Sequence, residues 1–228
     1  MTCASRGICL ITARNICKEY CDASEKIVIF DNLNFTIHSG ETIALMGQSG
    51  AGKSTLLHLL GGFDKPESGH IEINSQSISS MSDARLSRFR RQFLGMVFQQ
   101  YNLIPSLTAR DNISFVRRLN GLPAEDEFTR ELVHALQLQD RLDHYPSQLS
   151  GGEQQRVAIA RAIATQPLLI LADEPTGNLD EQTAAQVMTM LMRAVALQQS
   201  TLLLVTHSPT TASYLDKTWR LEQGQLLC

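Results

Sequence analysis

The sequence predicts an α/β fold: a mainly parallel sheet with crossover helices, an N-terminal antiparallel β layer and a helical insertion. A short apolar strand at 42–46 leads through a glycine-rich loop into a helix at 54–60. Strand, helix and strand follow each other again at 168–172, 180–199 and 201–206. Because such alternation is typical of parallel strands joined by helices, we expect both regions to share one sheet.

The segments between these regions are interpreted from their local patterns. Residues 28–30 and 33–37 are rich in Val, Ile and Phe, and we expect them to form strands of the antiparallel layer. Further strands are expected at 70–73 and 93–98, with an amphipathic helix at 83–91 between them. This helix carries four arginines that we expect on its solvated face: Arg85, Arg88, Arg90 and Arg91.

The stretch from about 101 to 165 is expected to be mostly helical. A helix at 108–120 ends at Gly121, and apolar residues recur at helical spacing within 124–138. We expect one domain over 1–228, composed of a core and an inserted helical subdomain. Their boundaries are about 1–98 and 166–228 for the core, and about 99–165 for the subdomain.

Composition excludes several classes of protein. The 228 residues include 20 Lys or Arg and 23 Asp or Glu, for a formal charge of −3, whereas a nucleic-acid binder is expected to be basic. No apolar run approaches the roughly 18–20 residues of a membrane span. The apolar stretch at 8–13 is too short for a signal peptide. We therefore expect the chain to remain in the cytosol and to reach a membrane only through a partner.

The cysteine count is five, which is odd, and no two cysteines form a C-x-x-C pair. This pattern argues against a disulfide framework and against a zinc site. We expect reduced, structurally incidental thiols.

The glycine-rich loop fits the pattern Gly-x4-Gly-Lys-Ser, which binds nucleotide phosphates. Its glycines allow backbone N–H groups to approach phosphate oxygens, and the helix that follows directs its positive dipole end at them. Lys53 is expected to reach the β- and γ-phosphates, and the Ser54 hydroxyl to bind Mg²⁺. The predicted binding residues are Gly47, Gln48, Ser49, Gly50, Ala51, Gly52, Lys53, Ser54 and Thr55.

Two acids follow the apolar strand at 168–172, at the sheet edge where open α/β sheets bind ligands. Adjacent carboxylates at the end of a buried strand need compensating charge, which Mg²⁺ supplies. We expect Asp173 to hold the ion together with Ser54. Glu174 is expected to orient or polarise the water that attacks the γ-phosphate.

A second glycine-rich helix start occurs at Ser150. Ser150 and Glu153 have the spacing of a capping box, which explains both of them but not Gly151 and Gly152 between them. Bare backbone at a helix N-terminus is again suited to an anion. One chain cannot easily direct two such sites at one nucleotide, whereas two copies arranged head to tail can.

The order and spacing of these motifs resemble ATP-binding cassette (ABC) ATPase subunits over essentially the whole chain. The resemblance adds Gln99, Asp180 and His207 to the site. It implies that Gln99 touches Mg²⁺ or the water and senses the membrane partner, that Asp180 links the two sites, and that His207 lies near the γ-phosphate.

The same resemblance implies a catalytic set, an ATP site and a dimer. Glu174, His207 and Gln99 are its catalytic residues, and Ser54, Gln99 and Asp173 its Mg²⁺ ligands. The segment Ser150–Gly152, called the signature segment below, would meet the γ-phosphate across a homodimer. Tyr20 would stack on adenine, an interaction worth roughly 1–3 kcal/mol.

Residues 56–62, 145–148 and 172–180 resemble one bacterial branch of this family, which includes lipoprotein-releasing (LolD), macrolide-exporter (MacB) and YbbA-like ATPases. The branch implies a separate transmembrane permease subunit with a periplasmic domain. A coupling helix of that subunit would contact the groove near residues 99–107. The branch also implies a location on the cytoplasmic face of the bacterial inner membrane.

Three alternatives stay open at this point. The first is a cargo-free regulatory ATPase whose membrane partner signals to cell-wall enzymes. The second is a small-molecule P-loop kinase, which would not need the Ser-Gly-Gly helix start. The third is a DNA-repair or translation ATPase of the same superfamily, for which the coiled-coil insertion and the second cassette are missing from the sequence.

Overall fold

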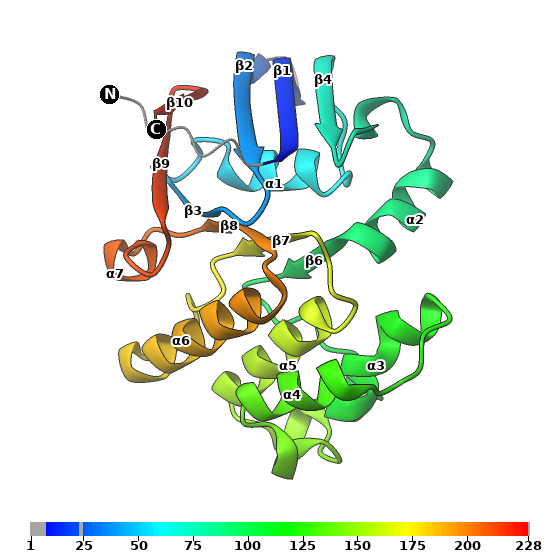
Figure 1. The fold of residues 1–228 in the computed structure, drawn as a ribbon. Coiled ribbons are helices and arrows are strands. Elements are labelled where there is room, and N and C mark those ends of the chain that lie inside the picture. Colours follow the sequence, from blue (N-terminus) through cyan, green and yellow to red (C-terminus); the bar gives the residue numbers. More distant parts are fainter. Residues whose placement is uncertain (1–7, 23–24, 228) are drawn as a thin grey trace.

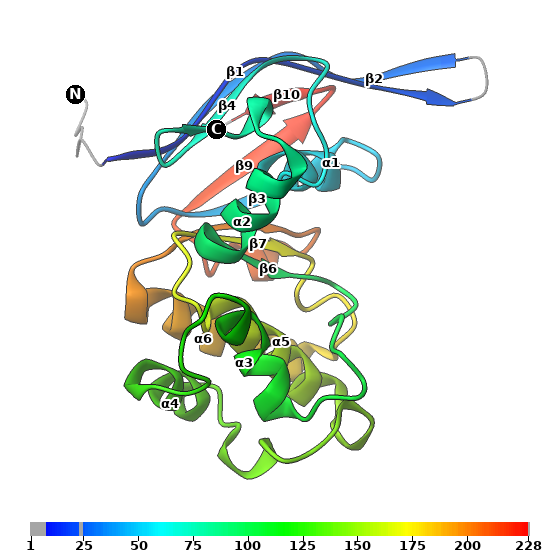
Figure 2. The same ribbon diagram turned by 90° about the vertical axis from the view of Figure 1, so that its right-hand side faces the viewer.

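A computed structural model describes residues 8–22 and 25–227. One of its two sheets is antiparallel and lies at the top of Figure 1, in the order β2-β1-β4-β5. Figure 2 shows β1 and β2 extending sideways together as a long ribbon. The strands are β1 (Cys9–Asp22), β2 (Glu25–His38), β4 (Ser68–Ile73) and β5 (Gln76–Ser77).

The second sheet has six strands in the order β10-β9-β3-β8-β7-β6. All of its pairings are parallel except that of β10 with β9. The prediction of a mainly parallel sheet shared by the two strand–helix regions is therefore confirmed. Its strands are β3 (Thr42–Met46), β6 (Leu94–Val97), β7 (Leu169–Asp173), β8 (Thr201–Val205), β9 (Lys217–Glu222) and β10 (Gln225–Leu227).

Helix α1 (Lys53–Leu60) lies between the two sheets (Figure 1). Four of its leucines are buried and pack in one cluster with residues of both sheets, such as Ile16 of β1 and Leu203 of β8. This contact fixes the start of α1, and with it the glycine-rich loop, relative to the ends of the parallel strands.

Helices α5 (Gly151–Ile163) and α6 (Glu181–Gln198) cover the other face of the six-stranded sheet. Helices α3 (Ala109–Leu119) and α4 (Glu127–Ala135) pack outside them, at the bottom of Figure 2. Of the remaining helices, α2 (Asp83–Phe93) precedes β6 and α7 (Pro209–Ala212) follows β8. Three single-turn helices are η1 (Ile78–Ser80), η2 (Gln139–Arg141) and η3 (Pro146–Gln148).

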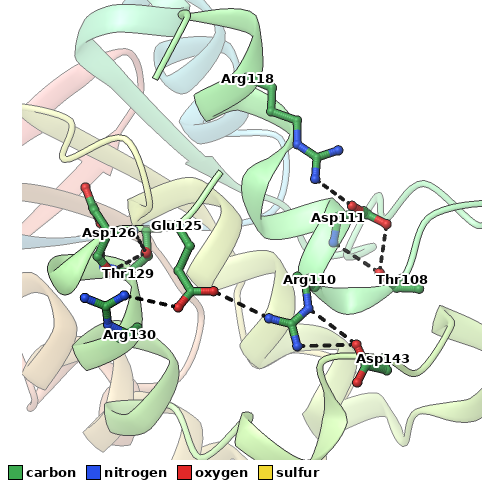
Figure 3. Close-up of polar contacts among 9 residues, drawn as sticks. All are labelled: Thr108, Arg110, Asp111, Arg118, Glu125, Asp126, Thr129, Arg130 and Asp143. Carbon is green, nitrogen blue, oxygen red and sulfur yellow. Dashed lines mark hydrogen bonds and ion pairs between the residues drawn. The ribbon is translucent and has the colours of Figure 1, made fainter. Parts of the chain in front are cut away.

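Polar contacts join α3, the start of α4 and the segment that leads to α5 (Figure 3). Arg110 of α3 lies between Glu125, at 3.5 Å, and Asp143, at 3.3 Å. The backbone of α3 adds two hydrogen bonds to the same segment, from Ala109 N to His144 O and from Arg110 N to Leu142 O, both of 2.8 Å. Residues 142–144 are therefore tied to α3 before the chain enters α5.

Several elements differ from the sequence predictions. The strands expected at 28–30 and 33–37 are one continuous strand, β2. Its partner β1 was not predicted, because register shifts and the left-handed Asn15 interrupt the alternation of buried and exposed residues. The helix expected at 124–138 is the shorter α4, because Asp126 caps its start in a capping box with Thr129.

The boundary between α2 and β6 also differs from the prediction. Phe93 ends α2 and packs against Phe89, with ring centroids 5.2 Å apart, so the strand begins at Leu94. Arg90 and Arg91 do not lie on a fully solvated face. Arg90 donates to Gly62 O at 2.7 Å and Arg91 to Leu119 O at 2.9 Å, so that only the other two arginines match the prediction.

The thiols of Cys9, Cys17 and Cys21 are free. Predictions for Cys3 and Cys228 concern residues outside the described ranges.

Candidate nucleotide site

A cavity of about 390 Å³ lies at the carboxyl ends of β3, β7 and β8, beside the start of α1. This edge of a parallel sheet is the usual place for a ligand in open α/β folds. The cavity brings together three predicted groups of residues: the glycine-rich loop, the acid after β7 and the histidine after β8. Its lining is Ile29, Ser49, Gly50, Gly52, Lys53, Ser54, Thr55, Glu174, Val205 and His207.

The glycine-rich loop curls around the ammonium group of Lys53. Lys53 is 6% exposed and donates to the carbonyls of Gly47 at 2.9 Å and Gln48 at 2.8 Å. Gly52 has φ +97°, and a Cβ there would lie 2.6 Å from Ile29 Cγ2. The loop therefore needs glycine at this position for two reasons, its left-handed backbone and its close contact with β2.

Burial lowers the pKa of Lys53, while the nearby charges of Glu174 and Asp173 raise it. The site thus places one cation and two carboxylates within electrostatic reach of each other. Such an arrangement suits a ligand that carries both negative phosphates and a divalent cation.

Glu174 adopts a left-handed backbone conformation directly after β7, with φ 43°. Its N–H donates to Val205 O at 3.0 Å, which fixes the turn against β8. Its carboxylate Oε1 lies 3.1 Å from His207 Nε2. Left-handed conformations are uncommon for residues other than glycine and cluster at functional sites. The turn brings the two predicted catalytic side chains into contact.

Gln99 reaches the same place from the segment after β6. The side chains of Gln99 and Glu174 both lie next to Gly177: a Cβ on this glycine would be 3.1 Å from Gln99 Nε2 and 3.2 Å from Glu174 Oε2. Asn178 Nδ2 donates to Gln99 O at 3.0 Å and ties the two segments together. The structure therefore places the Gln99 side chain beside Glu174.

The donor chemistry of this corner suits Mg²⁺. Ser54 offers a hydroxyl, Asp173 a carboxylate and Gln99 an amide oxygen, and Mg²⁺ binds oxygen donors, with one or two carboxylates plus substrate phosphates. Ser54 lines the cavity and Asp173 ends β7 beside it. The residues present fit the ion.

The signature segment lies elsewhere in the chain, at the start of α5. Ser150 Oγ accepts from Glu153 N at 3.3 Å, and Glu153 Oε2 accepts from the N–H and the hydroxyl of Ser150 at 2.8 and 2.9 Å. This confirms the capping box. None of residues 150–152 is among the residues that line the cavity described above. Within the described chain, the two glycine-rich helix starts therefore do not form one pocket.

The signature glycines also have a packing role that the sequence did not indicate. A Cβ on Gly152 would lie 2.6 Å from Thr183 Cγ2 of α6, and a Cβ on Gly151 would lie 3.0 Å from Tyr101 Oη. The close approach of α6 explains why Gly152 has no side chain. A Cβ on Gly151 would otherwise meet only ordinary contacts, such as Leu179 Cδ2 at 3.6 Å, so packing constrains Gly151 less.

Tyr20 lies on β1 beside the start of α1. Its hydroxyl donates to Asp64 Oδ2 at 2.9 Å, and the ammonium of Lys18 lies 4.8 Å from the ring centroid. Burial raises the pKa of Tyr20, and Thr55 of α1 is among the groups close enough to influence its hydroxyl. Tyr20 borders the loop but is not in the cavity wall.

Asp180 caps α6, with Oδ1 accepting from Thr183 N at 3.0 Å. Its predicted link to a second site stays a prediction.

Sequence reasoning missed two residues that line the cavity, Ile29 and Val205, and one residue beside the signature segment, Arg141. Ile29 forms part of the cavity wall, but an isoleucine in a strand carries no signal of this role. Arg141 donates through Nε to Glu153 Oε1 at 2.6 Å. Burial would raise the pKa of Glu153, but the hydrogen bonds from Arg141 and Ser150 lower it to about 2.

Comparisons with known proteins agree with this geometry. The family model described as ABC transporter matches residues 30–177. The lipoprotein-releasing system ATP-binding protein LolD of Hydrogenovibrio crunogenus is 41% identical over 220 residues, covering 96% of both chains. LolD of Treponema denticola is 43% identical over 224 residues, covering 97% of this chain and 98% of the relative.

Among solved structures, the dimeric structure of MJ0796, a bacterial ABC transporter cassette, superposes with a TM-score of 0.86 at 37% identity. The match covers 96% of this chain and 97% of that one. A second structure of MJ0796, a post-hydrolysis state bound to ADP and Pi, gives the same TM-score at 36% identity. With a family match over more than half of its length and relatives similar over nearly their full length, this chain belongs to the ABC transporter family and is an ATP-binding cassette.

Proposed function

We propose that this chain is the ATP-hydrolysing subunit of a bacterial transporter of the lipoprotein-releasing type. Two chains would act together and drive a separate membrane subunit that has a periplasmic domain. The similarity to lipoprotein-releasing system ATP-binding proteins supports this proposal, because it extends over nearly the full length of this chain and of each relative.

In the proposed mechanism, the loop from Gly47 to Thr55 holds the triphosphate and Lys53 neutralises its β- and γ-phosphates. Ser54, Asp173 and Gln99 would hold Mg²⁺, which neutralises charge on the phosphates when bound. Glu174 orients the attacking water and accepts its proton. His207, 3.1 Å from Glu174, holds this carboxylate and contacts the γ-phosphate.

The observation that carries the proposed dimer is the separation of the two phosphate-binding helix starts. The signature segment does not line the P-loop cavity of its own chain. A second copy placed head to tail would supply Ser150, Gly151 and Gly152 to the γ-phosphate. Asp180, which caps α6 near the signature segment, would link the two sites. Tyr20 would stack on the adenine at the outer end of the cavity.

A groove of about 400 Å³ provides the proposed contact with the membrane subunit. It lies between β6 and helices α3 and α5. Its lining includes Phe98, together with Asn102 and Ile104 of the segment 99–107 that is expected to receive a coupling helix. Two aromatic side chains in it are partly exposed, Phe63 at 52% and Phe115 at 38%. Arg90, Arg91 and Arg161 add positive charge, so we propose that an amphipathic helix with apolar and acidic side chains docks here.

We further propose a location on the cytoplasmic face of the bacterial inner membrane. Across residues 8–22 and 25–227, no helix is both long enough and apolar enough to cross a bilayer. The membrane-spanning part of the proposed complex would be supplied by the partner. We propose that residues from about 99 to 165 form a helical subdomain that moves together with the docked coupling helix.

Substitution of Glu174 by Gln tests the proposed catalytic role. The amide keeps the shape of the side chain but cannot accept the proton of the attacking water. We expect ATP binding to be retained, turnover to be nearly lost and a long-lived ATP-bound dimer to accumulate, measured by phosphate release and light scattering. Hydrolysis at the unmodified rate would contradict the assignment.

A further inference from the structure

The start of α5 carries a carboxylate at the place where the proposed function needs to attract a phosphate. Glu153 is the third residue of α5, its side chain is 16% exposed, and its Oε2 accepts both the N–H and the hydroxyl of Ser150. A carboxylate stabilises a helix N-terminus, but it also repels an incoming phosphate. The chain therefore needs to compensate this charge without displacing the serine.

Arg141 compensates the negative charge of Glu153 by binding the carboxylate oxygen that does not contact Ser150. Its Nε donates to Glu153 Oε1 at 2.6 Å, which leaves Oε2 to hold Ser150. Arg156 also lies near Glu153, but its Nε is buried and has no hydrogen-bond partner among the described residues. Arg141 is therefore the arginine that hydrogen-bonds to the carboxylate.

The segment that carries Arg141 is held in place from outside α5. It is tied to α3 by the two backbone hydrogen bonds of residues 142 and 144, and by the contact of Arg110 with Asp143 that Figure 3 shows. Leu138, just before Arg141, is fully buried in the helical core. The guanidinium thus reaches Glu153 from a fixed position.

We propose that Arg141 is a positioning residue for ATP-driven dimer closure. It holds the Glu153 carboxylate on Ser150 and neutralises it, so that the signature segment can receive the partner's γ-phosphate. This inference rests on the proposed sandwich dimer. It predicts that Arg141 matters only while residue 153 is charged.

A double-variant comparison in the Glu174→Gln background tests this. ATP-dependent dimerisation would be measured by analytical ultracentrifugation, and ATP affinity of the dilute single chain by fluorescence with a labelled ATP analogue. We expect Arg141→Met to weaken dimerisation at least about tenfold and to leave the ATP affinity of the single chain unchanged. Glu153→Gln, which removes the charge but keeps the shape, is expected to dimerise nearly as well as the parent.

The decisive variant is Arg141→Met combined with Glu153→Gln, which we expect to dimerise like Glu153→Gln alone. Arg141→Lys keeps the positive charge, so we expect its ATP-dependent dimerisation to be stronger than that of Arg141→Met and weaker than that of the parent. Arg130→Met is the matched control, because Arg130 is also paired with an acid, Glu125, but is 65% exposed on α4. Thermal unfolding of each variant checks that it folds.

Each outcome has one meaning. If Arg141→Met dimerises like the parent, or if the double variant is as weak as Arg141→Met, the positioning role is wrong. If the parent itself does not dimerise with ATP, the proposed sandwich dimer fails instead.

Discussion

Replacement of Gly151 by proline would remove one proposed phosphate donor while leaving the helix intact. Gly151 is the first residue of α5, where the N–H has no partner within the helix and proline is favoured. The preceding Ser150 has φ −64° and ψ 161°, the extended conformation that a residue before proline prefers. The substitution should therefore not disturb folding.

The expected magnitude follows from the loss of one hydrogen bond to a charged group, about 1.5–3 kcal/mol, or roughly 10- to 150-fold in affinity. Gly151→Ala is the matched control. Both variants add a Cβ that lies 3.0 Å from Tyr101 Oη and 3.6 Å from Leu179 Cδ2, but alanine keeps the N–H.

ATP-dependent dimerisation of both variants would be measured in the Glu174→Gln background, with thermal unfolding alongside. We expect the alanine variant to dimerise nearly like the parent and the proline variant to be at least about tenfold weaker, at similar thermal stability. Equal dimerisation of the two variants would refute the reasoning that this backbone N–H binds phosphate.

The remaining predictions concern packing, binding and acid stability. Gly152→Ala adds a methyl 2.6 Å from Thr183 Cγ2, and this overpacking should cost about 1–3 kcal/mol and lower the melting temperature by several degrees. Combination with Thr183→Ser, which removes the threonine methyl, should restore the melting temperature. If the melting temperature does not recover, the strain lies elsewhere. Lys53→Ala should abolish ATP binding in calorimetry, and unchanged affinity would remove Lys53 from the site. The pKa of Glu153 is lowered from 4.5 to about 2, so its stabilisation is complete above pH 4.5 and is lost as the pH falls through 2. The stabilisation is at most about 3 kcal/mol, and less because Arg141 is 43% exposed. Measured by urea unfolding, the free energy of unfolding of Glu153→Gln should therefore fall less than that of the parent between pH 4.5 and 2. An equal fall in both would contradict the ion pair.

Elements whose local pattern agrees with their environment could be predicted from sequence. Strand β3 and helix α6 were expected within a residue or two of their ends, because a fully buried strand and a capped helix each have a strong local signal. Strand β1 was missed, because its register shifts arise from pairing with β2 and β4, which the sequence of β1 alone does not encode. Ser208 caps α7 with Pro209 at its first turn, as local chemistry predicts.

The same distinction applies to the site. The P-loop and Glu174 were predicted because short local motifs at the ends of strands indicate their chemistry, whereas His207 was assigned only through the family resemblance. Arg141 was not, because its partner lies twelve residues along the chain on another element and only the folded segment brings them together. The packing of Gly152 against Thr183 is likewise a tertiary contact, and sequence reasoning assigned that glycine wholly to phosphate binding.

Mixing two inactive variants tests the central claim most directly. Chains with Lys53→Ala lack a working P-loop, and chains with Gly151→Asp carry a carboxylate where the partner's phosphate is expected. Neither variant by itself should form the closed dimer in which ATP is trapped. If each pocket is built from two chains, a mixed pair has one intact site of two. An equal mixture should then trap about a quarter of the ATP held by unmodified chains if pairing is random, and up to about half if only mixed pairs form. If the mixture stays as inactive as its components, each pocket is built within one chain and the account is wrong.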